Sequence, residues 1–375
     1  MRKEITLSPV VAFDSYALPV EREILAALGD LLYRPLLDIL AGAGLKAGAP
    51  PPAFRPRKAG GKRENTVRQS AGEIVAQALR DRRIWFANGA FSGRFDARVS
   101  RALRDLGATP GRRAGQHSFH LPPSRALPAA VGAAAAESLA ASREVHAVIN
   151  RFLIQIYDGI SAAPHPVDLK ISTETLARAA GGQFDAATAP LRGVHEIPAG
   201  VQPAMRAALD ADFNRNVNLG IKGFTQERVA ALRELVVKNA EAGHRSDRLV
   251  EIVKAEIGVG QRRAEFIARQ ETALYVSKLT GQRYRDAGIT RYRWSTSNDR
   301  RVRHDHRELN NRVFDFSSPP IVDRATGRRA NPGEDFNCRC AALPIVVIDD
   351  FAEAELDRGF HENAAPVCVR GGVFA

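Results

Sequence analysis

A run of helical apolar spacing from Thr225 to Gly288 constrains the fold of this chain more than any other feature of its sequence. Within it, Leu249, Ile252 and Val253 fall on one face of a helix, which is the spacing of a helix packed against a core. Thr225 is a residue type that caps helix starts, and glycines that favour helix ends follow the apolar segments. The pattern predicts three helices, over 225–243, 246–260 and 261–288, the second of them ending at the Gly258/Gly260 pair.

Further helical segments are predicted upstream of this run. An Ala-rich stretch from Pro128 to about Ile160 indicates one or two long helices. Near the N-terminus, REILAALGDLLYRPLLDIL has the apolar spacing of a helix, which we expect to break near Pro35 because proline removes an interior hydrogen bond. Residues 165–222 show no pattern that assigns a fold. The middle of the protein is therefore predicted to be mostly helical.

Residues 65–124 mix helix and strand signals. A helix is predicted to about Arg82, followed by a short strand, IWF, and a turn at Asn88-Gly89, since both residue types tolerate positive φ. A spacing of four residues between apolar positions then predicts a buried helix face ended by Gly107. That face comprises Phe91, Phe95, Val99 and Leu103.

The sequence changes character after Gly288. ITRYRWST alternates as an exposed strand does, with Trp294 as an anchor, and RVFDF and LPIVVID are typical of further strands. DRRVRHDHRELNN suits a short helix with Asp299 at or near its N-cap. A Pro- and Gly-rich loop between the last strands carries the CRC sequence of Cys338 and Cys340. These elements predict a small C-terminal α+β module.

The predicted fold class is α+β, with a predominantly helical body and this small C-terminal α+β module. The stretch from Gly42 to Arg63 carries six basic residues, no acidic ones and a Pro run, so it is not expected to pack a core of its own. We expect six segments: an N-terminal helical segment 1–41, a basic Pro/Gly-rich linker 42–64, a region 65–124, a helical body 125–285, the C-terminal module 286–349 and a tail 350–375.

Composition indicates a basic globular protein. The net charge of +12 and a pI near 10.0 favour polyanionic partners such as nucleic acid, although a general bias toward Arg and Ala explains the same excess. Three cysteines exclude a disulfide framework and fit a reducing compartment. The N-terminus lacks the apolar region of a signal peptide, and no stretch approaches the roughly 18 apolar residues of a membrane span. We expect a protein made in the cytoplasm, with no membrane partner.

The spacing of Cys338 and Cys340 leaves three kinds of chemistry open. Thiolates and imidazoles are preferred ligands of zinc, so zinc is the candidate cofactor. With one intervening residue, the two sulfurs of a CxC sequence turn toward one ion less easily than those of the CxxC sequence in most structural zinc sites. Two reduced thiols packed in the module fit the CxC spacing as well. Redox or catalytic chemistry is the third interpretation. The third candidate zinc ligand is His304 or His306, with a fourth from Asp299, Asp305 or Asp335.

A catalytic interpretation makes Cys338 a nucleophile, served by His306 and Asp299 as an acid–base pair. Such a site also needs an orienting third group and an oxyanion site, and the spacing specifies neither. We therefore assign no catalytic residue, and the protein is not expected to be an enzyme.

Nine arginines and four acidic residues lie between Arg283 and Arg312, interleaved with Tyr and Trp. Guanidinium groups bind phosphate bidentately and stack on aromatic rings, which fits nonspecific binding of double-stranded DNA. The candidate DNA-binding residues are Arg283, Arg285, Arg291, Arg293, Arg300 and Arg301. The alternative is a salt-bridged surface, whose pairs would join Arg303 and Arg339 to Asp299, Glu334 or Asp335.

Two blocks of this sequence resemble the phage Mu protein F-like minor head proteins, the phage head morphogenesis domain family. YRWSTSNDRRVRHDHRELNN, followed by PGEDFNCRC, is similar to the C-terminal domain of that family, and IARQETA (Ile267 to Ala273) resembles the helix that precedes it. RRIWFANGAFSGRFDARVSRALRDLGA resembles the N-terminal region of the family. The residues of the C-terminal motif are Trp294, Asp299, Arg303, His306, Pro332, Cys338, Arg339 and Cys340.

The resemblance implies a low-copy virion protein inside the phage head, near the portal. It implies roles in head morphogenesis and in DNA packaging or delivery, through contacts with portal or major capsid protein. Some relatives continue into a toxin or enzyme domain, whereas only residues 350–375 follow the module here, so no added catalytic domain is expected. The alternatives are a metal- or cysteine-dependent nuclease or hydrolase packaged in the virion, and a plain nucleic-acid-binding module.

Overall fold

The computed structural model describes residues 2–45, 69–113, 116–165, 167–193, 195–242 and 246–349. Most of the predicted basic linker and the whole predicted tail lie outside these residues. The chain divides into two compact units. Unit 1 comprises residues 1–28, 165–224 and 260–375, and unit 2 comprises residues 29–164 and 225–259.

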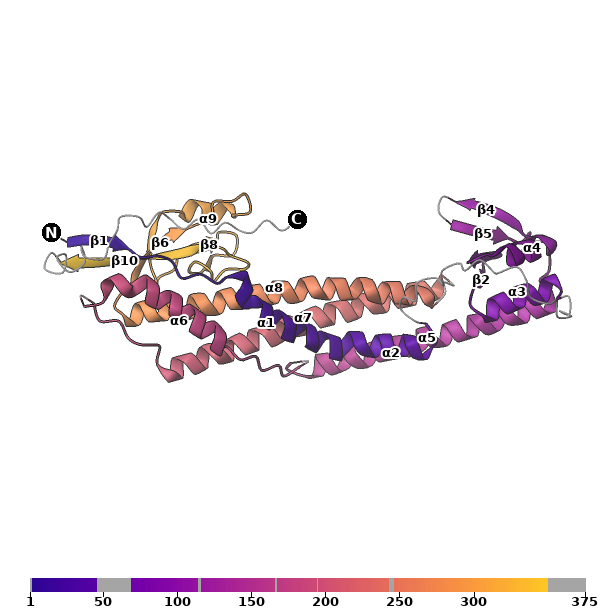
Figure 1. Ribbon diagram of the computed structural model, residues 1–375, viewed down its shortest axis with the longest axis horizontal. Helices are drawn as coiled ribbons and strands as arrows, with labels where there is room; N and C mark the ends of the chain where they lie inside the picture. Colours follow the sequence, from indigo (N-terminus) through magenta and orange to yellow (C-terminus); the bar gives the residue numbers. More distant parts are fainter. Residues whose placement is uncertain are drawn as a thin grey trace, which may run out of the picture. The chain divides into compact units, whose positions relative to one another are not determined.

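Two long helices run through both units, α7 (Pro203–Glu241) and α8 (Asp247–Asp286). They lie side by side and antiparallel (Figure 1). In unit 1, Gly220 of α7 allows close approach, because an added Cβ would lie 3.3 Å from the Ile267 side chain on α8. In unit 2, Arg228 of α7 donates to the Glu256 carboxylate on α8 over 2.8 Å. The two helices therefore form a hairpin held by apolar packing in one unit and by an ion pair in the other.

The helix ends predicted inside this hairpin are wrong. Thr225 is fully buried within α7 and does not begin it, and α8 continues through Gly258 and Gly260 without a break. A helix-interior glycine costs only about 1 kcal/mol, which the burial of neighbouring side chains such as Val253 and Ala264 outweighs. The predicted stop at Gly243 lies outside the described residues.

Unit 2 packs three helices against a small antiparallel sheet. The sheet has the strand order β2-β3-β5-β4, and its core includes Val75, Ile84, Phe91, Leu103 and Val131. The elements are a π-helical segment Gly29–Tyr33, α2 (Arg34–Gly42), α3 (Ala71–Arg80), β2 (Ile84–Ala87), β3 (Ala90–Gly93), α4 (Ala97–Asp105), β4 (Thr109–Arg113), β5 (Gln116–His120) and α5 (Ala129–Ala162). The Ala-rich stretch therefore forms one helix, α5.

The turn predicted at Asn88-Gly89 is confirmed. Both residues have positive φ, 51° and 74°, and they join β2 to β3 as a two-residue turn. The predicted four-residue spacing covers two element types, because Phe91 lies on β3 and α4 begins only after its N-cap, Asp96. Gly107 ends that helix with a φ of 85°. The strands β4 and β5 carried no recognisable strand signal.

Unit 1 contains a four-stranded antiparallel sheet of order β1-β10-β6-β7. Its strands are β1 (Arg2–Thr6), β6 (Arg291–Ser295), β7 (Val313–Asp315) and β10 (Ala341–Asp349). Around it lie α1 (Asp14–Leu28), α6 (Glu174–Thr188), a 3-10 turn Ala189–Leu191, α9 (His304–Leu309) and the hairpin of β8 (Ile321–Asp323) and β9 (Arg328–Arg329). The predicted strands of the C-terminal module and its short helix are present.

The N-terminal segment was predicted to be helical from an apolar pattern that begins at Arg22, and the residues before that pattern include a strand. Residues Arg2 to Thr6 form the edge strand β1, which pairs with β10 in a register from Arg2–Asp349 to Thr6–Ile345. Helix α1 then contains Pro19 and passes into the π-helical segment just before Pro35, so the helix changes type there and does not end.

The core of unit 1 lies between the sheet and the helices α6 and α8 (Figure 1). Phe184 of α6 contacts Tyr284 near the end of α8, with ring centroids 4.8 Å apart, and Tyr284 stacks on Phe316. Tyr292 and Trp294 of β6 are fully buried in the same cluster. This core fixes the position of β6 and of the loop before β10. No helix in the described part of the chain is long and apolar enough to cross a membrane.

Candidate metal centre

Three potential metal ligands converge beside β6 in unit 1. His306 lies on α9, and Cys338 and Cys340 lie in the loop that leads into β10. The Nδ1 atom of His306 is 3.6 Å from the Cys338 sulfur and 3.5 Å from the Cys340 sulfur. The three ligand atoms lie within 4.8 Å of one another. His306 and Cys340 are buried, and Cys338 is half-buried.

The loop that carries the cysteines is tied to helix α8. The Ser277 hydroxyl donates to the Pro332 carbonyl over 2.6 Å, and Gln270 accepts from the backbone N–H of Asn337. Gly333 has a φ of 85° and packs so closely on Ser277 that a Cβ would lie 3.1 Å from that side chain. A glycine is needed at this position for both its φ and its lack of a side chain. These contacts fix the backbone that presents both thiols.

Asp335 orients the imidazole of His306. Its Oδ2 lies 2.9 Å from His306 Nε2, and because a carboxylate only accepts, Nε2 carries a proton and Nδ1 faces the sulfurs. The Asp335 side chain has no exposed surface and also forms ion pairs with Arg303 and Arg328. A buried carboxylate held by two guanidinium groups therefore fixes which imidazole nitrogen faces the thiols.

The two thiols differ in acidity. The pKa of Cys338 is lowered well below its usual value, chiefly by a hydrogen bond from Cys340, with further bonds from His306 and the backbone N–H groups of Gly333 and Cys340. The pKa of Cys340 is raised, first by its hydrogen bond to Cys338 and then by burial. Burial lowers the pKa of His306, but Cys338 and Asp335 outweigh burial and leave it raised. The cluster therefore favours a thiolate at Cys338 beside a charged imidazole.

Other predicted partners lie away from the cluster. The His304 side chain is 74% exposed and sits 3.6 Å from Glu308, so His304 points to solvent and is not a fourth ligand. Asp305 accepts from the backbone N–H of Arg324, 3.0 Å away. Asp299 does not cap α9, whose N-cap is Arg303; it pairs with Arg339 over 2.6 Å. The catalytic interpretation, which assigned no residue, would have paired His306 with Asp299; in the structure Asp335 is the carboxylate that contacts the imidazole.

The remaining motif residues support the cluster. Trp294 is fully buried and meets the His306 ring edge to face at 5.6 Å. Arg303 pairs with Asp335 and donates to the Phe336 carbonyl, while Arg339 pairs with Asp299. Both arginines therefore take part in the salt bridges that the sequence left as one of two alternatives.

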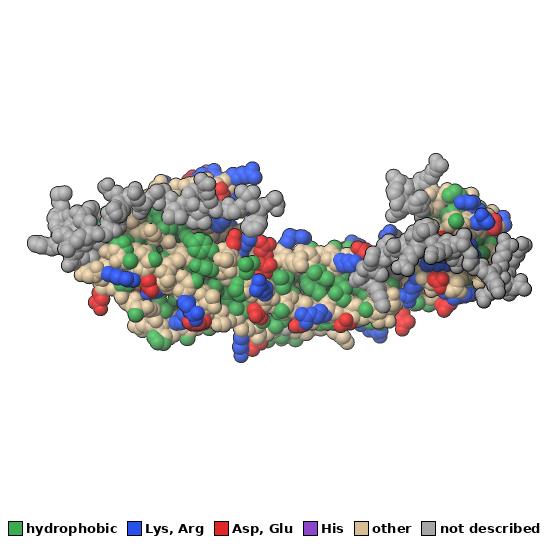
Figure 2. Space-filling view, in the orientation of Figure 1, with side chains coloured by type: hydrophobic (Ala, Val, Ile, Leu, Met, Phe, Trp, Pro, Cys, Tyr) green, Lys and Arg blue, Asp and Glu red, His purple; other side chains and the backbone are tan. Residues whose placement is uncertain are grey.

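The six candidate DNA-binding arginines have different environments. Arg283 is only 6% exposed, lies over the Phe184 ring and pairs with Asp185, so it cannot contact a phosphate without unfolding its surroundings. Of the others, Arg285 donates to Gln282, Arg291 to Glu4 and Arg293 to the Asn311 carbonyl. Arg300 and Arg301 are exposed and have no ion-pair partner in the described part of the chain. In Figure 2, basic and acidic side chains alternate over the visible face.

A hollow of about 390 Å³ lies close to these last two arginines. It is lined by Thr296, Asn298, Asp299, Arg300, Val302 and Arg307. None of the three clustered ligands lines it. The hollow is lined by polar side chains and by the guanidinium groups of Arg300 and Arg307, and guanidinium groups bind anions.

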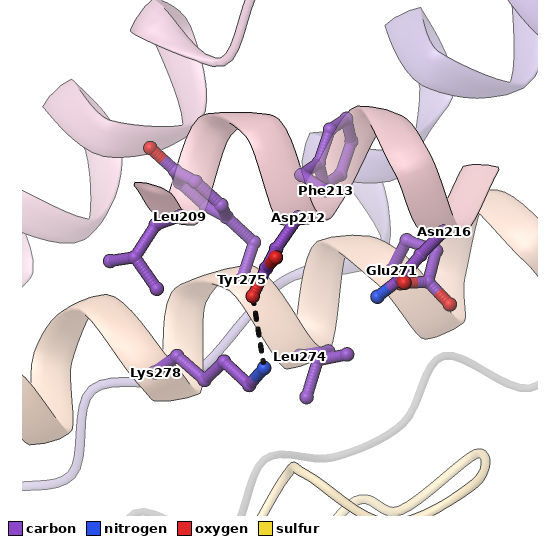
Figure 3. A pocket seen from close by; sticks show the side chains of 8 residues that line it. All are labelled: Leu209, Asp212, Phe213, Asn216, Glu271, Leu274, Tyr275 and Lys278. Atoms are coloured by element: carbon purple, nitrogen blue, oxygen red, sulfur yellow. Dashed lines mark ion pairs between the residues drawn. The ribbon is translucent and has the colours of Figure 1, made fainter. Parts of the chain in front are cut away.

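A second hollow lies between α7 and α8 in unit 1 (Figure 3). Its volume of about 10 Å³ is only that of a single water. Lys278 lies 3.9 Å from Asp212 at its edge, drawn as a dashed line. Glu271 projects into the same place, where burial raises its pKa more than Asn216 and Lys278 lower it. The hollow is too small for a substrate. It contains Glu271, whose carboxyl group has a higher pKa in the folded state than in the unfolded chain.

Replacement of Glu271 by Gln is expected to stabilise the protein at neutral pH. Because the folded pKa of Glu271 is raised, the folded state binds the proton more tightly, and wild-type stability falls as pH rises through that pKa. The gain in melting temperature of Glu271→Gln should be largest at neutral pH and should vanish below the ordinary Glu pKa of 4.5. Thermal unfolding over a pH series measures it, with the exposed Glu144→Gln as control. A gain that is constant with pH would contradict this origin.

Sequence reasoning gave Asp335 as a possible fourth ligand and as a salt-bridge partner of Arg303 or Arg339, and it missed the contact of Asp335 with His306. Asn331 was also missed: it accepts from the Tyr292 hydroxyl over 3.0 Å and donates to the Phe316 carbonyl, joining the cysteine loop to the core. The available signal was position, since both residues flank the Pro332–Gly333 turn that leads into the CRC sequence. Residue types alone do not say which carboxylate meets the imidazole.

Comparison with known proteins covers this region. Residues 230–343 match the family model described as Phage Mu protein F like protein. An uncharacterized protein of Haemophilus influenzae is 31% identical over 131 residues, which cover 35% of this chain and 28% of that protein. This chain therefore spans less than a third of that relative. No solved structure matches the chain. The family match runs from the second half of α7 to the start of β10 and includes all three clustered ligands.

Proposed function

We propose that this chain, whose residues 230–343 form a Phage Mu protein F-like domain, is a non-enzymatic minor head protein of a tailed phage or prophage. It acts in head morphogenesis and in DNA packaging or delivery, inside the head of the virion, and is present in the host cytoplasm during assembly. The family match carries this proposal. The resemblance of residues 82–108 to the N-terminal region of the family lies outside that match and remains a prediction.

The architecture supports a role in positioning other proteins. In unit 1, the small sheet domain packs against the end of α8, beside the paired segments of α7 and α8. Helix surfaces of this kind suit contacts with portal or major capsid protein. The surface includes large apolar side chains such as Leu219 on α7, which is 49% exposed, and Leu18 on α1, also 49% exposed.

The test is whether the chain belongs to assembled heads. Heads purified by density gradient from a phage or prophage that encodes it should contain the chain in few copies, and portal protein should co-purify with it from lysates. A deletion should reduce the yield of filled, infective heads, and the chain supplied in trans should restore that yield. Heads that lack the chain, together with unchanged infectivity of the deletion, would remove the proposal.

The Cys338–His306–Asp335 array favours a second function, a cysteine-dependent hydrolase. A thiolate, an imidazole and a carboxylate stand in the order of a nucleophile, its base and an orienting group. Against it, the described hollow nearby is lined by none of the three residues. A Cys338→Ser variant that remains folded, with its head yield measured, separates the two functions. If the chain is a hydrolase, this variant should lose its hydrolytic activity and still associate with heads.

Nonspecific binding of double-stranded DNA is part of the proposed role, and Arg300 and Arg301 are its best-placed residues. We expect the logarithm of the binding constant to fall linearly with the logarithm of salt concentration, because phosphate contacts release counterions. The double variant Arg300→Ala/Arg301→Ala should lower the magnitude of that slope by about two and weaken binding for all sequences alike.

A matched double variant controls for net charge. Arg248→Ala/Arg262→Ala removes two exposed arginines of α8 that lie outside the predicted cluster. It should leave the salt slope as it is. Fluorescence anisotropy with a labelled duplex measures both. Equal slopes for the two double variants would show that the contacts lie elsewhere, and a flat salt dependence of the wild type would exclude phosphate contacts.

A further inference from the structure

We infer that Cys338, Cys340 and His306 bind one zinc ion, with the two sulfurs and the Nδ1 atom of the imidazole as its protein ligands. This site differs from the one expected from sequence, because His304 points to solvent and Asp335 contacts the other nitrogen of His306. The inference does not depend on the proposed role in head assembly.

The ligand spacing is that of a tetrahedral zinc site. Zn–S bonds of about 2.3 Å and Zn–N bonds of about 2.0–2.1 Å, set at a tetrahedral angle, place a sulfur and a nitrogen ligand about 3.5–3.6 Å apart. The two observed distances from His306 Nδ1 are 3.6 Å to Cys338 and 3.5 Å to Cys340. The chain therefore already holds the imidazole nitrogen at the separation from each sulfur that the ion requires.

Hydrogen bonding and metal binding would use the same three atoms. Since Nε2 of His306 donates to Asp335, only Nδ1 faces the sulfurs. One ring nitrogen makes one good hydrogen bond, yet two sulfurs stand at nearly the same distance from it. Once the Nδ1 and thiol protons have left, Zn²⁺ binds the lone pair of Nδ1 and both thiolates at once.

The surroundings supply the outer contacts of a metal site. Metal-binding histidines commonly donate their second ring N–H to a carboxylate, and Asp335 accepts this bond over 2.9 Å. The Cys338 sulfur accepts from the backbone N–H of Cys340 over 3.4 Å and from that of Gly333. Such N–H groups spread the negative charge of a bound thiolate. Arg303 and Arg328 offset the charge of Asp335.

The ion would act as a structural clip. It joins α9 to the loop before β10, which carry ligands separated by 32 and 34 residues along the chain. Among the described residues, no fourth His, Cys, Asp or Glu side chain joins the cluster. Since zinc ligands must lose their protons, binding should weaken as the pH falls.

The experiment uses the full chain without a polyhistidine tag, purified with zinc and then dialysed. Elemental analysis should find about one zinc per chain. Cys338→Ser, Cys340→Ser and His306→Ala should each lose most of it, whereas the matched control His304→Ala, two residues from a ligand on the same helix, should retain it. Circular dichroism identifies variants that fail to fold, and these are set aside.

Cobalt and thiol titration test the ligands in the wild type, without any substitution. Co²⁺ added to metal-free protein should give the thiolate-to-cobalt charge-transfer band and the intense visible bands of a tetrahedral site, and zinc should displace it. Zinc should also slow the reaction of the two thiols with a disulfide reagent at least tenfold. Metal-free protein that remains folded, shows no cobalt bands and has thiols that zinc does not protect would overturn the inference.

Discussion

Asp335→Ala is expected to destabilise unit 1 by about 2–4 kcal/mol, although Asp335 touches neither thiol. The substitution leaves the buried Nε2–H of His306 without an acceptor, and an unpaired buried donor costs about 1–3 kcal/mol. It also removes the shared partner of Arg303 and Arg328. These two side chains are 45% and 35% exposed, so water can solvate them and each ion pair contributes at most about 1 kcal/mol.

The two tryptophans of the chain allow this loss to be assigned. Trp294 lies in unit 1 beside His306, and Trp85 lies in unit 2. In a Trp85→Phe background, fluorescence during urea unfolding reports only the surroundings of Trp294. Unfolding measured in the presence of a metal chelator gives the loss of stability caused by Asp335→Ala without any contribution from bound metal.

Asp299→Ala is the matched control, because Asp299 also pairs with an arginine, Arg339, but is 37% exposed. It should cost no more than about 1 kcal/mol. Asp335→Asn should fall between the two, since an amide oxygen can still accept from His306 while the charge is lost. Equal losses for Asp335→Ala and Asp299→Ala would mean that burial of the carboxylate has no energetic role.

The helical body and the module could be predicted because their signals are local. Apolar spacing identified the helical run from Thr225 through α8 but not the first half of α7, and alternation around Trp294 identified β6. The predicted ends failed for a physical reason. Residues such as Gly258 and Thr225 favour helix ends only weakly, and packing against a neighbouring helix outweighs that preference.

The pairing of β1 with β10 could not be predicted. The five residues of β1 carry no local signal for a partner that begins at Ala341, since only the tertiary fold brings the two strands together. The same limit applied to the site. Asp299 is seven residues from His306 and Asp335 is twenty-nine, yet the turn at Pro332–Gly333 directs the farther carboxylate to the imidazole. Residue types predicted the chemistry, and loop geometry decided which residues perform it.

Trp294→Ala is expected to cost about 3–5 kcal/mol, the largest loss of the substitutions considered, because it empties a fully buried site on the central strand β6. The indole contacts the rings of His306 and Phe314, with centroids 5.6 Å and 6.3 Å away. It thus packs the metal-ligand cluster against the sheet. Hydrogen exchange of the β6 and β10 amides and urea unfolding followed by circular dichroism would measure the loss in chelator.

Two further variants test whether the loss comes from the buried volume. Trp294→Phe keeps most of the ring volume and should lose much less stability than Trp294→Ala. Phe336→Ala removes an aromatic ring from the same loop as the cysteines, but Phe336 is 57% exposed and rests on Arg328, so it should cost no more than about 1 kcal/mol. If Phe336→Ala proved as costly as Trp294→Ala, the core between β6 and α9 would not be what holds the ligand cluster in place. If instead Trp294→Ala costs more stability than Phe336→Ala, Trp294 belongs to the motif because it fixes the position of His306. Its effect on stability is then independent of bound metal.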